Sequence, residues 1–207
     1  MRFWGWWGVV LVGVLATGCS GSESPDDGAG DDNRATAGAT ATAEWSTPDG
    51  TAPSSSASRH EELTVDRARP CDLLTEDQLG ELGLTGEQTS DLSSTWSTDT
   101  CRTWDADKTL SASVTAVSTE GVDAFYRGRF ANMRYRPTEV AGLPALFYRF
   151  DGVEHACYLA IDVADGQLLD VAFGANAPES TDASLDELCD TARRVGEAAV
   201  RTLRAAG

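Results

Sequence analysis

A long stretch almost without large apolar side chains is the feature that most constrains how this chain can fold. Residues 20–62 consist mainly of Ser, Gly, Ala, Thr, Asp and Pro, with Trp45 as the exception, and hold nine acidic residues against two arginines. Such a segment cannot bury enough apolar surface to offset the entropy lost on ordering. We therefore expect residues 19–62 to form a disordered acidic linker and residues 63–207 to form one globular domain of ordinary size.

A short apolar run precedes this linker. It begins at Phe3 and ends in the sequence Leu-Ala-Thr-Gly-Cys, whose cysteine is Cys19. A membrane-spanning helix needs about 20 apolar residues, whereas a shorter run that ends in small residues is typical of a signal peptide. The ending resembles the lipobox of bacterial lipoproteins. This resemblance implies a signal peptide over residues 1–18 and attachment of diacylglycerol, and of further acyl chains such as palmitate, to Cys19. An uncleaved N-terminal anchor helix is the alternative.

The charge balance excludes one large class of partners. The chain has 16 basic and 33 acidic residues and a formal net charge of -17. Non-specific binding of nucleic acid requires clustered Lys and Arg that neutralise phosphates, so we expect no nucleic-acid partner. Lys108 is the single lysine, and this preference for Arg, together with abundant Ala and Gly, is typical of a GC-rich genome such as that of an actinobacterium.

Helical and strand patterns alternate along residues 63–207. Capping boxes at Thr75–Gln78 and Ser184–Glu187 predict helices over about 76–82 and 184–205, and apolar residues at three-and-four spacing predict another over 121–133. Alternating runs, two of them preceded by Asp-Gly turns, predict strands over 101–104, 110–117, 145–150, 153–163 and 167–173. The fold class is therefore predicted as α+β, with helices packed on an antiparallel sheet of about five strands.

Four cysteines remain in the predicted domain once Cys19 is set aside. An even number in an exported domain implies disulfides, and three pairings are possible. We prefer Cys71–Cys101 and Cys157–Cys189, because the second would join a central strand to the apolar face of the last helix. Each bond would close a loop of about thirty residues, worth roughly 3–4 kcal/mol. The spacing lacks the Cys-x-x-Cys pairs of a zinc site, so we expect no metal.

No catalytic pattern is evident in the predicted domain. His155 is its single histidine and falls within a predicted strand. The sequence lacks a Gly-x-Ser-x-Gly elbow for a serine nucleophile, and it lacks a phosphate-binding loop and an HExxH metal motif. We therefore predict no catalytic residue and no cofactor.

One local cluster of positive charge interrupts the acidic composition. The segment from residue 126 to residue 136 contains no acid and holds four arginines. If the segment is helical, Arg127 and Arg134 lie two turns apart on one face. Such a patch could meet anionic headgroups or an acidic partner. The alternative is a solvated face that pairs with the surplus carboxylates. The patch consists of Arg127, Arg129, Arg134 and Arg136.

The cysteine frame resembles that of a known family. Pro70-Cys-Asp-Leu-Leu-Thr75 is followed by Cys101-Arg-Thr-Trp104, then by Cys157 in a strand and Cys189 in the last helix. This frame, with the lipobox and the polar linker, resembles a family of uncharacterised actinobacterial lipoproteins that is catalogued only as a domain of unknown function. The resemblance covers essentially the whole mature chain and implies no activity.

These observations lead to a functional expectation. We expect a monomeric, non-enzymatic binding domain, held at the outer face of the cell membrane by the lipid on Cys19 and serving envelope signalling or assembly through an unknown envelope protein. The first alternative is a carrier with a pocket between sheet and helices for a lipid or other apolar ligand. The second is an envelope hydrolase.

Overall fold

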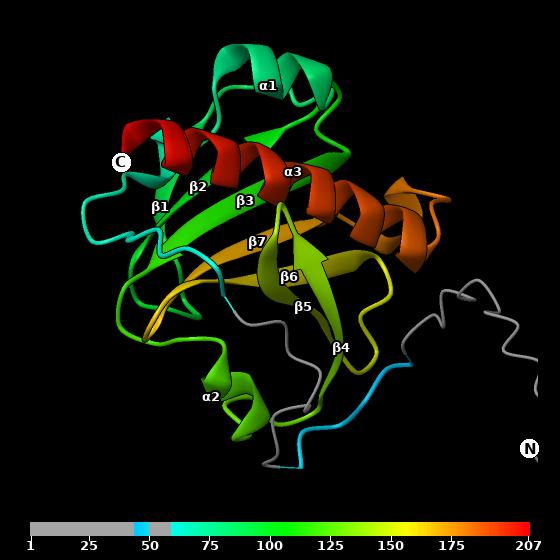
Figure 1. Cartoon of the computed structure of the whole chain (residues 1–207). Helices are drawn as coiled ribbons and strands as arrows, with labels where there is room; N and C mark the ends of the chain where they lie inside the picture. Colours follow the sequence, from blue (N-terminus) through cyan, green and yellow to red (C-terminus); the bar gives the residue numbers. More distant parts are fainter. Residues whose placement is uncertain (1–43, 50–58) are drawn as a thin grey trace, which may run out of the picture. The chain divides into compact units, whose positions relative to one another are not determined.

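The computed structural model describes residues 44–49 and 59–207. These residues form one antiparallel sheet of seven strands in the order β1-β2-β3-β7-β6-β5-β4, with helices packed on it (Figure 1). The strands are β1 (Thr89–Leu92), β2 (Asp99–Trp104), β3 (Leu110–Val117), β4 (Met133–Val140), β5 (Leu143–Phe150), β6 (Ala156–Ala164) and β7 (Gln167–Ala175). The helices are α1 (Glu76–Glu81), α2 (Asp123–Tyr126) and α3 (Leu185–Ala206), with short 3-10 turns η1 (Pro70–Asp72) and η2 (Pro178–Ser180).

The α+β class and the antiparallel sheet with helices on it are confirmed, but the expected number of strands is too small. The two additional strands are β1 and β4, which form the two edges of the sheet. Three of the four residues of β1 are exposed, so β1 has no apolar alternation to reveal it. Strand β4 contains Pro137 and two arginines, which obscure a strand pattern. The first and last helices both begin with the predicted capping box.

The predicted helix over 121–133 is wrong apart from a single turn, α2. Gly128 has a φ of 80° and Asn132 a φ of 58°, and this left-handed conformation ends a right-handed helix. The apolar residues that suggested a helix face are nevertheless buried, because Phe125 and Tyr126 pack into an aromatic cluster on the sheet. The three-and-four spacing thus reflected burial but not a long helix.

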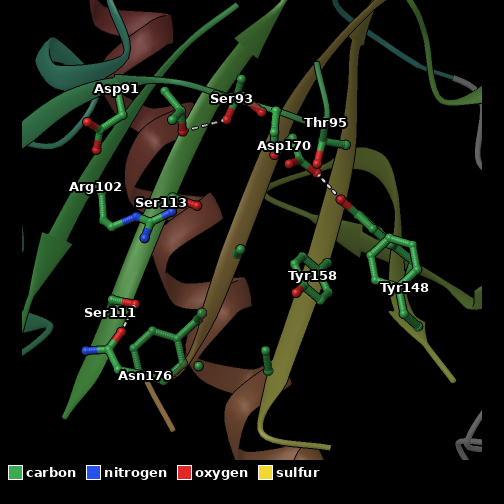
Figure 2. Close-up of a pocket in the computed structure, with 18 of the residues that line it drawn as sticks. Asp91, Ser93, Thr95, Arg102, Ser111, Ser113, Tyr148, Tyr158, Asp170 and Asn176 are labelled. Atoms are coloured by element: carbon green, nitrogen blue, oxygen red, sulfur yellow. Dashed lines mark hydrogen bonds between the residues drawn. The ribbon is translucent and has the colours of Figure 1, made fainter. Parts of the chain in front are cut away.

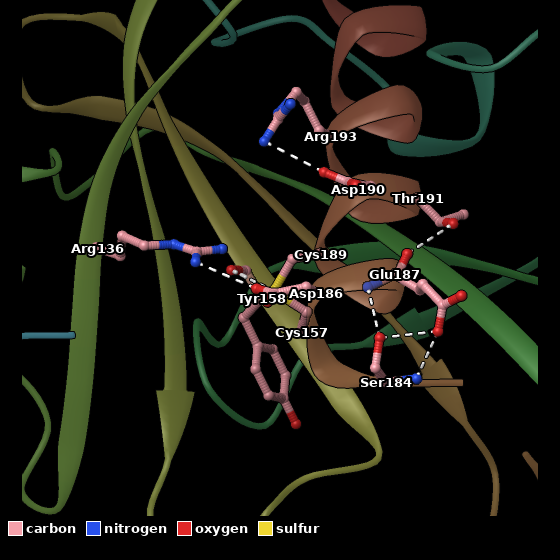
Figure 3. A network of polar contacts seen from close by, with 10 residues as sticks. All are labelled: Arg136, Cys157, Tyr158, Ser184, Asp186, Glu187, Cys189, Asp190, Thr191 and Arg193. Atoms are coloured by element: carbon pink, nitrogen blue, oxygen red, sulfur yellow. Dashed lines mark hydrogen bonds and ion pairs between the residues drawn. A yellow bond between two sulfur atoms is a disulfide. The ribbon is translucent and has the colours of Figure 1, made fainter. Parts of the chain in front are cut away.

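Helix α3 covers one face of the sheet. It contacts β6 and β7 most extensively and also reaches β3 and β4 (Figure 1). A side chain on Gly196 would lie 2.9 Å from the Cδ atoms of Leu159 and Ile161, so this glycine allows the helix to approach the sheet closely. The Cys157–Cys189 disulfide joins β6 to α3 within this core (Figure 3), and Cys71–Cys101 joins η1 to β2. Both disulfides have the preferred pairing.

Part of the expected linker is in contact with the domain. Ser46 and Tyr135 exchange two backbone hydrogen bonds of 2.8 Å, and the Trp45 ring lies 4.9 Å from the Arg136 guanidinium and 5.1 Å from that of Arg149. Arg59 donates a hydrogen bond of 2.7 Å to Asp162. These contacts correct the expectation that all of residues 19–62 are disordered, because the one large apolar side chain of the linker is partly buried against the core.

The signal peptide over residues 1–18 and the lipidated Cys19 lie outside the described residues. In the described part of the chain, no helix has both the length and the apolar character that a membrane span requires.

Candidate functional site

The face of the sheet opposite α3 carries a hollow of about 410 Å³. The strand register explains where it lies, because Arg102, Ser113, Ala172 and Tyr158 face one another on β2, β3, β7 and β6. Neighbouring strands are 4.7–4.9 Å apart, so the backbones of Arg102 and Tyr158 are separated by roughly 14 Å. Between these two long side chains stand only a serine and an alanine. The hollow is therefore a gap between large side chains over a floor of small ones (Figure 2).

A glycine shapes one end of this floor. Gly174 of β7 lines the hollow, and a Cβ atom there would lie 2.5 Å from the backbone oxygen of His155 and 2.6 Å from the Cβ of Ala156. The His155 carbonyl also accepts a hydrogen bond of 2.8 Å from the amide of Ala175. Only glycine permits so close a passage of the two strands.

The wall on the β2 and β3 side is polar. Ser111 donates a hydrogen bond of 3.0 Å to Asn176, and Thr115 donates one of 2.8 Å to Thr100. The Arg102 side chain is exposed and makes no hydrogen bond or ion pair with any described residue. This wall therefore offers to the hollow hydroxyl groups and one arginine whose side chain has no ion-pair partner among the described residues.

The opposite wall is aromatic. The Tyr158 ring stacks on Tyr148 with a centroid distance of 5.1 Å and meets the edge of Phe150 at 5.5 Å. Burial raises the pKa of the Tyr158 hydroxyl, and the nearby Asp170 carboxylate adds to this effect while Arg102 opposes it. The hydroxyl therefore keeps its proton at neutral pH. Tyr158 presents both a ring and a hydroxyl group to the hollow.

Asp170 lines the hollow on the same face of β7 as Ala172. Its carboxylate accepts hydrogen bonds of 2.6 Å from the Tyr148 hydroxyl and 2.9 Å from the indole N–H of Trp96. Burial raises its pKa to about 6, although the two hydrogen bonds act in the opposite direction. Trp96 belongs to the turn between β1 and β2, and this turn supplies Ser93 and Thr95 to the rim of the hollow. One buried carboxylate therefore joins the rim to the aromatic wall.

The arginine patch expected from the sequence does not form one positive surface. Arg127 and Arg134 do not share a helix face, because Arg127 follows α2 whereas Arg134 lies on β4. All four arginines have carboxylate partners in the structure, as the alternative interpretation held. The pairs are Arg127 with Asp123, Arg129 with Glu120 at 2.7 Å, Arg134 with Asp151 at 2.9 Å, and Arg136 with Asp186 at 3.2 Å (Figure 3).

Two further sequence expectations concern chemistry. His155 lies just before β6 rather than within a strand, and it lines the mouth of the hollow. Its side chain has no hydrogen-bond partner within the part of the chain that the structure describes. The described residues also contain no group of three His, Cys, Asp or Glu side chains placed to hold a metal ion.

Sequence reasoning missed this hollow. Its residues come from six strands and from the turn between β1 and β2, and only the strand register brings them together. One local signal was available, because Asp170 stands within the apolar run Leu168-Leu-Asp-Val171 of β7. A single acid in an otherwise apolar strand indicates a buried carboxylate with hydrogen-bond partners.

Comparison with known proteins identifies a family without an assigned activity. Among curated proteins and among solved structures, no significant match to the chain was found. A family model described as "Protein of unknown function (DUF3558)" matches residues 14–202, which include both disulfides and every residue of the hollow. The chain belongs to this family.

Proposed function

We propose that this protein is a cell-envelope lipoprotein, anchored at the outer face of the membrane through Cys19, whose domain is a non-enzymatic binding module. The observation that carries the binding role is the hollow of about 410 Å³ over the small-residue floor of the sheet. Ligand sites in proteins are typically concavities of this size order with a few convergent polar groups. The two disulfides support a location in an oxidising compartment outside the cytosol.

The composition of the walls favours a small polar ligand. Arg102 and the hydroxyl groups of β3 lie on one side, and the Tyr158 ring lies on the other. A ligand with polar groups along one edge and an apolar face would satisfy both walls. Binding would then support envelope signalling or assembly, in which the domain presents a ligand-dependent surface to an envelope partner.

The aromatic wall also gives a reason to keep the carrier hypothesis. Phe150, Tyr148 and Tyr158 form part of a continuous ring cluster, which an apolar ligand could extend. The polar wall opposite makes this the second candidate, because an apolar ligand would remove the water from Arg102 and the serines without replacing their hydrogen bonds.

Native mass spectrometry of the full chain, extracted from its host envelope, tests the binding role. The wild type is compared with Ala172→Leu, which fills the floor of the hollow from a half-buried position. We expect a small polar molecule to be retained by the wild type and lost from the variant. A lipid retained by the wild type alone would support the carrier instead, and equal retention by both proteins would contradict the hollow as the site.

Labelling of host cells with a palmitate analogue tests the anchor. We expect the wild type to become labelled and Cys19→Ala to remain unlabelled. Equal labelling of both chains would contradict lipidation at Cys19.

A further inference from the structure

Arg102 is one of three arginines in the described region whose side chains have no carboxylate, carbonyl or ring partner there. The others are Arg67 and Arg201, and of the three only Arg102 lines the hollow, where its guanidinium lies beside Ser113 (Figure 2). An arginine beside aligned hydroxyl groups is suited to bind a carboxylate or a phosphate through two parallel hydrogen bonds. The polar wall thus provides an anchor for one acidic group.

The remaining charges limit how acidic the ligand can be. Asp91 of β1 also lines the hollow, where its carboxylate accepts a hydrogen bond of 3.3 Å from Thr89. Asp170 lines the hollow on the same face of β7 as Ala172, with its two oxygens engaged by Tyr148 and Trp96. Two carboxylates near a single arginine repel a polyanion, but exposed Asp91 can accept hydrogen bonds from hydroxyl groups. A ligand with one acidic group and several hydroxyl groups fits this distribution.

The row across the sheet sets the size and shape of such a ligand. Arg102 and Tyr158 stand at its two ends, separated by Ser113 and Ala172. A compact ring placed over the alanine can lay its apolar C–H face against the tyrosine ring, which carries negative potential on its face. Its acidic substituent then reaches the arginine, and its hydroxyl groups meet the serines.

We propose that the hollow binds a hydroxylated ligand of monosaccharide size that carries one acidic group, a sugar acid or a sugar phosphate. Arg102 holds the acidic group, Ser111 and Ser113 bind hydroxyl groups, and Tyr158 packs against the ring. This assignment rests on the proposed binding function and specifies its ligand class.

Isothermal titration calorimetry of the full chain in mild detergent tests the assignment with three probes. Glucuronate carries a carboxylate, glucose 6-phosphate carries a phosphate, and glucose carries neither. We expect at least one acidic probe to bind about tenfold or more tightly than glucose, because a hydrogen bond to a charged group is stronger than one between neutral groups. The more tightly bound acidic probe identifies which acid the site prefers.

Arg102→Gln supplies the decisive variant, since this exposed side chain makes no hydrogen bond or ion pair with a described residue and its replacement should leave the fold intact. We expect it to lose about tenfold or more in affinity for the acidic probe and little for glucose. Arg201→Gln, an exposed arginine on α3, is the matched control and should bind like the wild type. Arg102→Lys should recover only part of the affinity, because lysine cannot form the two parallel bonds.

Each contrary result has a distinct meaning. Equal affinity for glucose and the acidic probes, no binding of either acidic probe, or unchanged binding by Arg102→Gln would overturn the ligand class. The binding function itself would still stand if the wild type retained another envelope molecule that Ala172→Leu lost. Equal retention by the wild type and Ala172→Leu would overturn the site as well.

Discussion

The two faces of the sheet are built from the same strands but have different roles. Along β6, Leu159 and Ile161 point toward α3 and are completely buried, whereas Tyr158 points to the opposite face and lines the hollow. On β3 and β7 the difference is sharper, because Val114 and Val171 are buried in the covered face while Ser113 and Ala172 remain half-buried in the open one. Strand alternation therefore lets one face pack against α3 while the other accommodates a site beside the aromatic cluster around Phe125.

Truncation of a covered residue should have the largest effect. We expect Leu159→Ala to lower the free energy of unfolding by about 2–5 kcal/mol, because it leaves a cavity between β6 and α3. Ser113→Ala on the open face should change it by about 0.5 kcal/mol or less. Urea unfolding of both variants measures these two changes. Similar losses of unfolding free energy would show that Ser113 contributes to stability as much as Leu159 does.

The disulfide within the covered face provides the next comparison. We expect replacement of Cys157 and Cys189 together by serine to cost roughly 3–4 kcal/mol from loop entropy alone. The Cys71–Cys101 bond closes a loop of similar length, with separations of 30 and 32 residues for the two bonds. Its double replacement should cost less, because Cys71 is only half-buried and a serine there is partly hydrated. Thermal unfolding of both double variants checks this order. Equal losses of stability, or a larger loss without Cys71–Cys101, would contradict it.

The buried carboxylate of Asp170 on the open face should make the free energy of unfolding depend on pH. The pKa of Asp170 is raised to about 6 from 3.8, so the folded state binds its proton more tightly than the unfolded state does. The stability it contributes is complete below about pH 4 and is lost as the pH rises through about 6, a change of roughly 3 kcal/mol. We expect Asp170→Asn to remove this slope.

The asparagine variant also separates charge from hydrogen bonding. The asparagine oxygen can accept the hydrogen bond from Tyr148, but the NH₂ group cannot accept the one from Trp96. We therefore expect the free energy of unfolding to fall further, by about 1–2 kcal/mol, at low pH. Urea unfolding between about pH 4 and pH 7 measures both effects. A slope that is unchanged in the variant would assign the pH dependence to other carboxyl groups.

A smaller effect should come from residues 44–49, at the rim of the covered face. We expect Trp45→Ala to cost about 1 kcal/mol, because it removes ring contacts with Arg136 and Arg149 that are worth about 0.5–1 kcal/mol each. Hydrogen exchange of the Tyr135 amide should accelerate, since its bond to Ser46 depends on the segment. Trp45→Phe is the control and should retain most of the protection. Unchanged exchange in Trp45→Ala would show that the backbone pairing does not need the ring.

Local signals in the sequence predicted much of the covered face and little of the open one. The two capping boxes located α1 and α3, and the Asp-Gly pairs marked the turns at Gly152 and Gly166, where φ is 83° and 71°. These features act between neighbours in the chain, so a sequence pattern contains them. The hollow depends on the register of β2, β3, β7 and β6, and no local pattern specifies which strands become neighbours.

The backbone pairing of Ser46 with Tyr135 has a consequence for the protein at high local concentration. An open edge strand can template the addition of another chain and so lead to aggregation. On β4, Ser46 already occupies the N–H and C=O groups of Tyr135, and Pro137, two residues along the same edge, has no N–H to donate. A second copy crowded against this edge thus finds little backbone to which it can add.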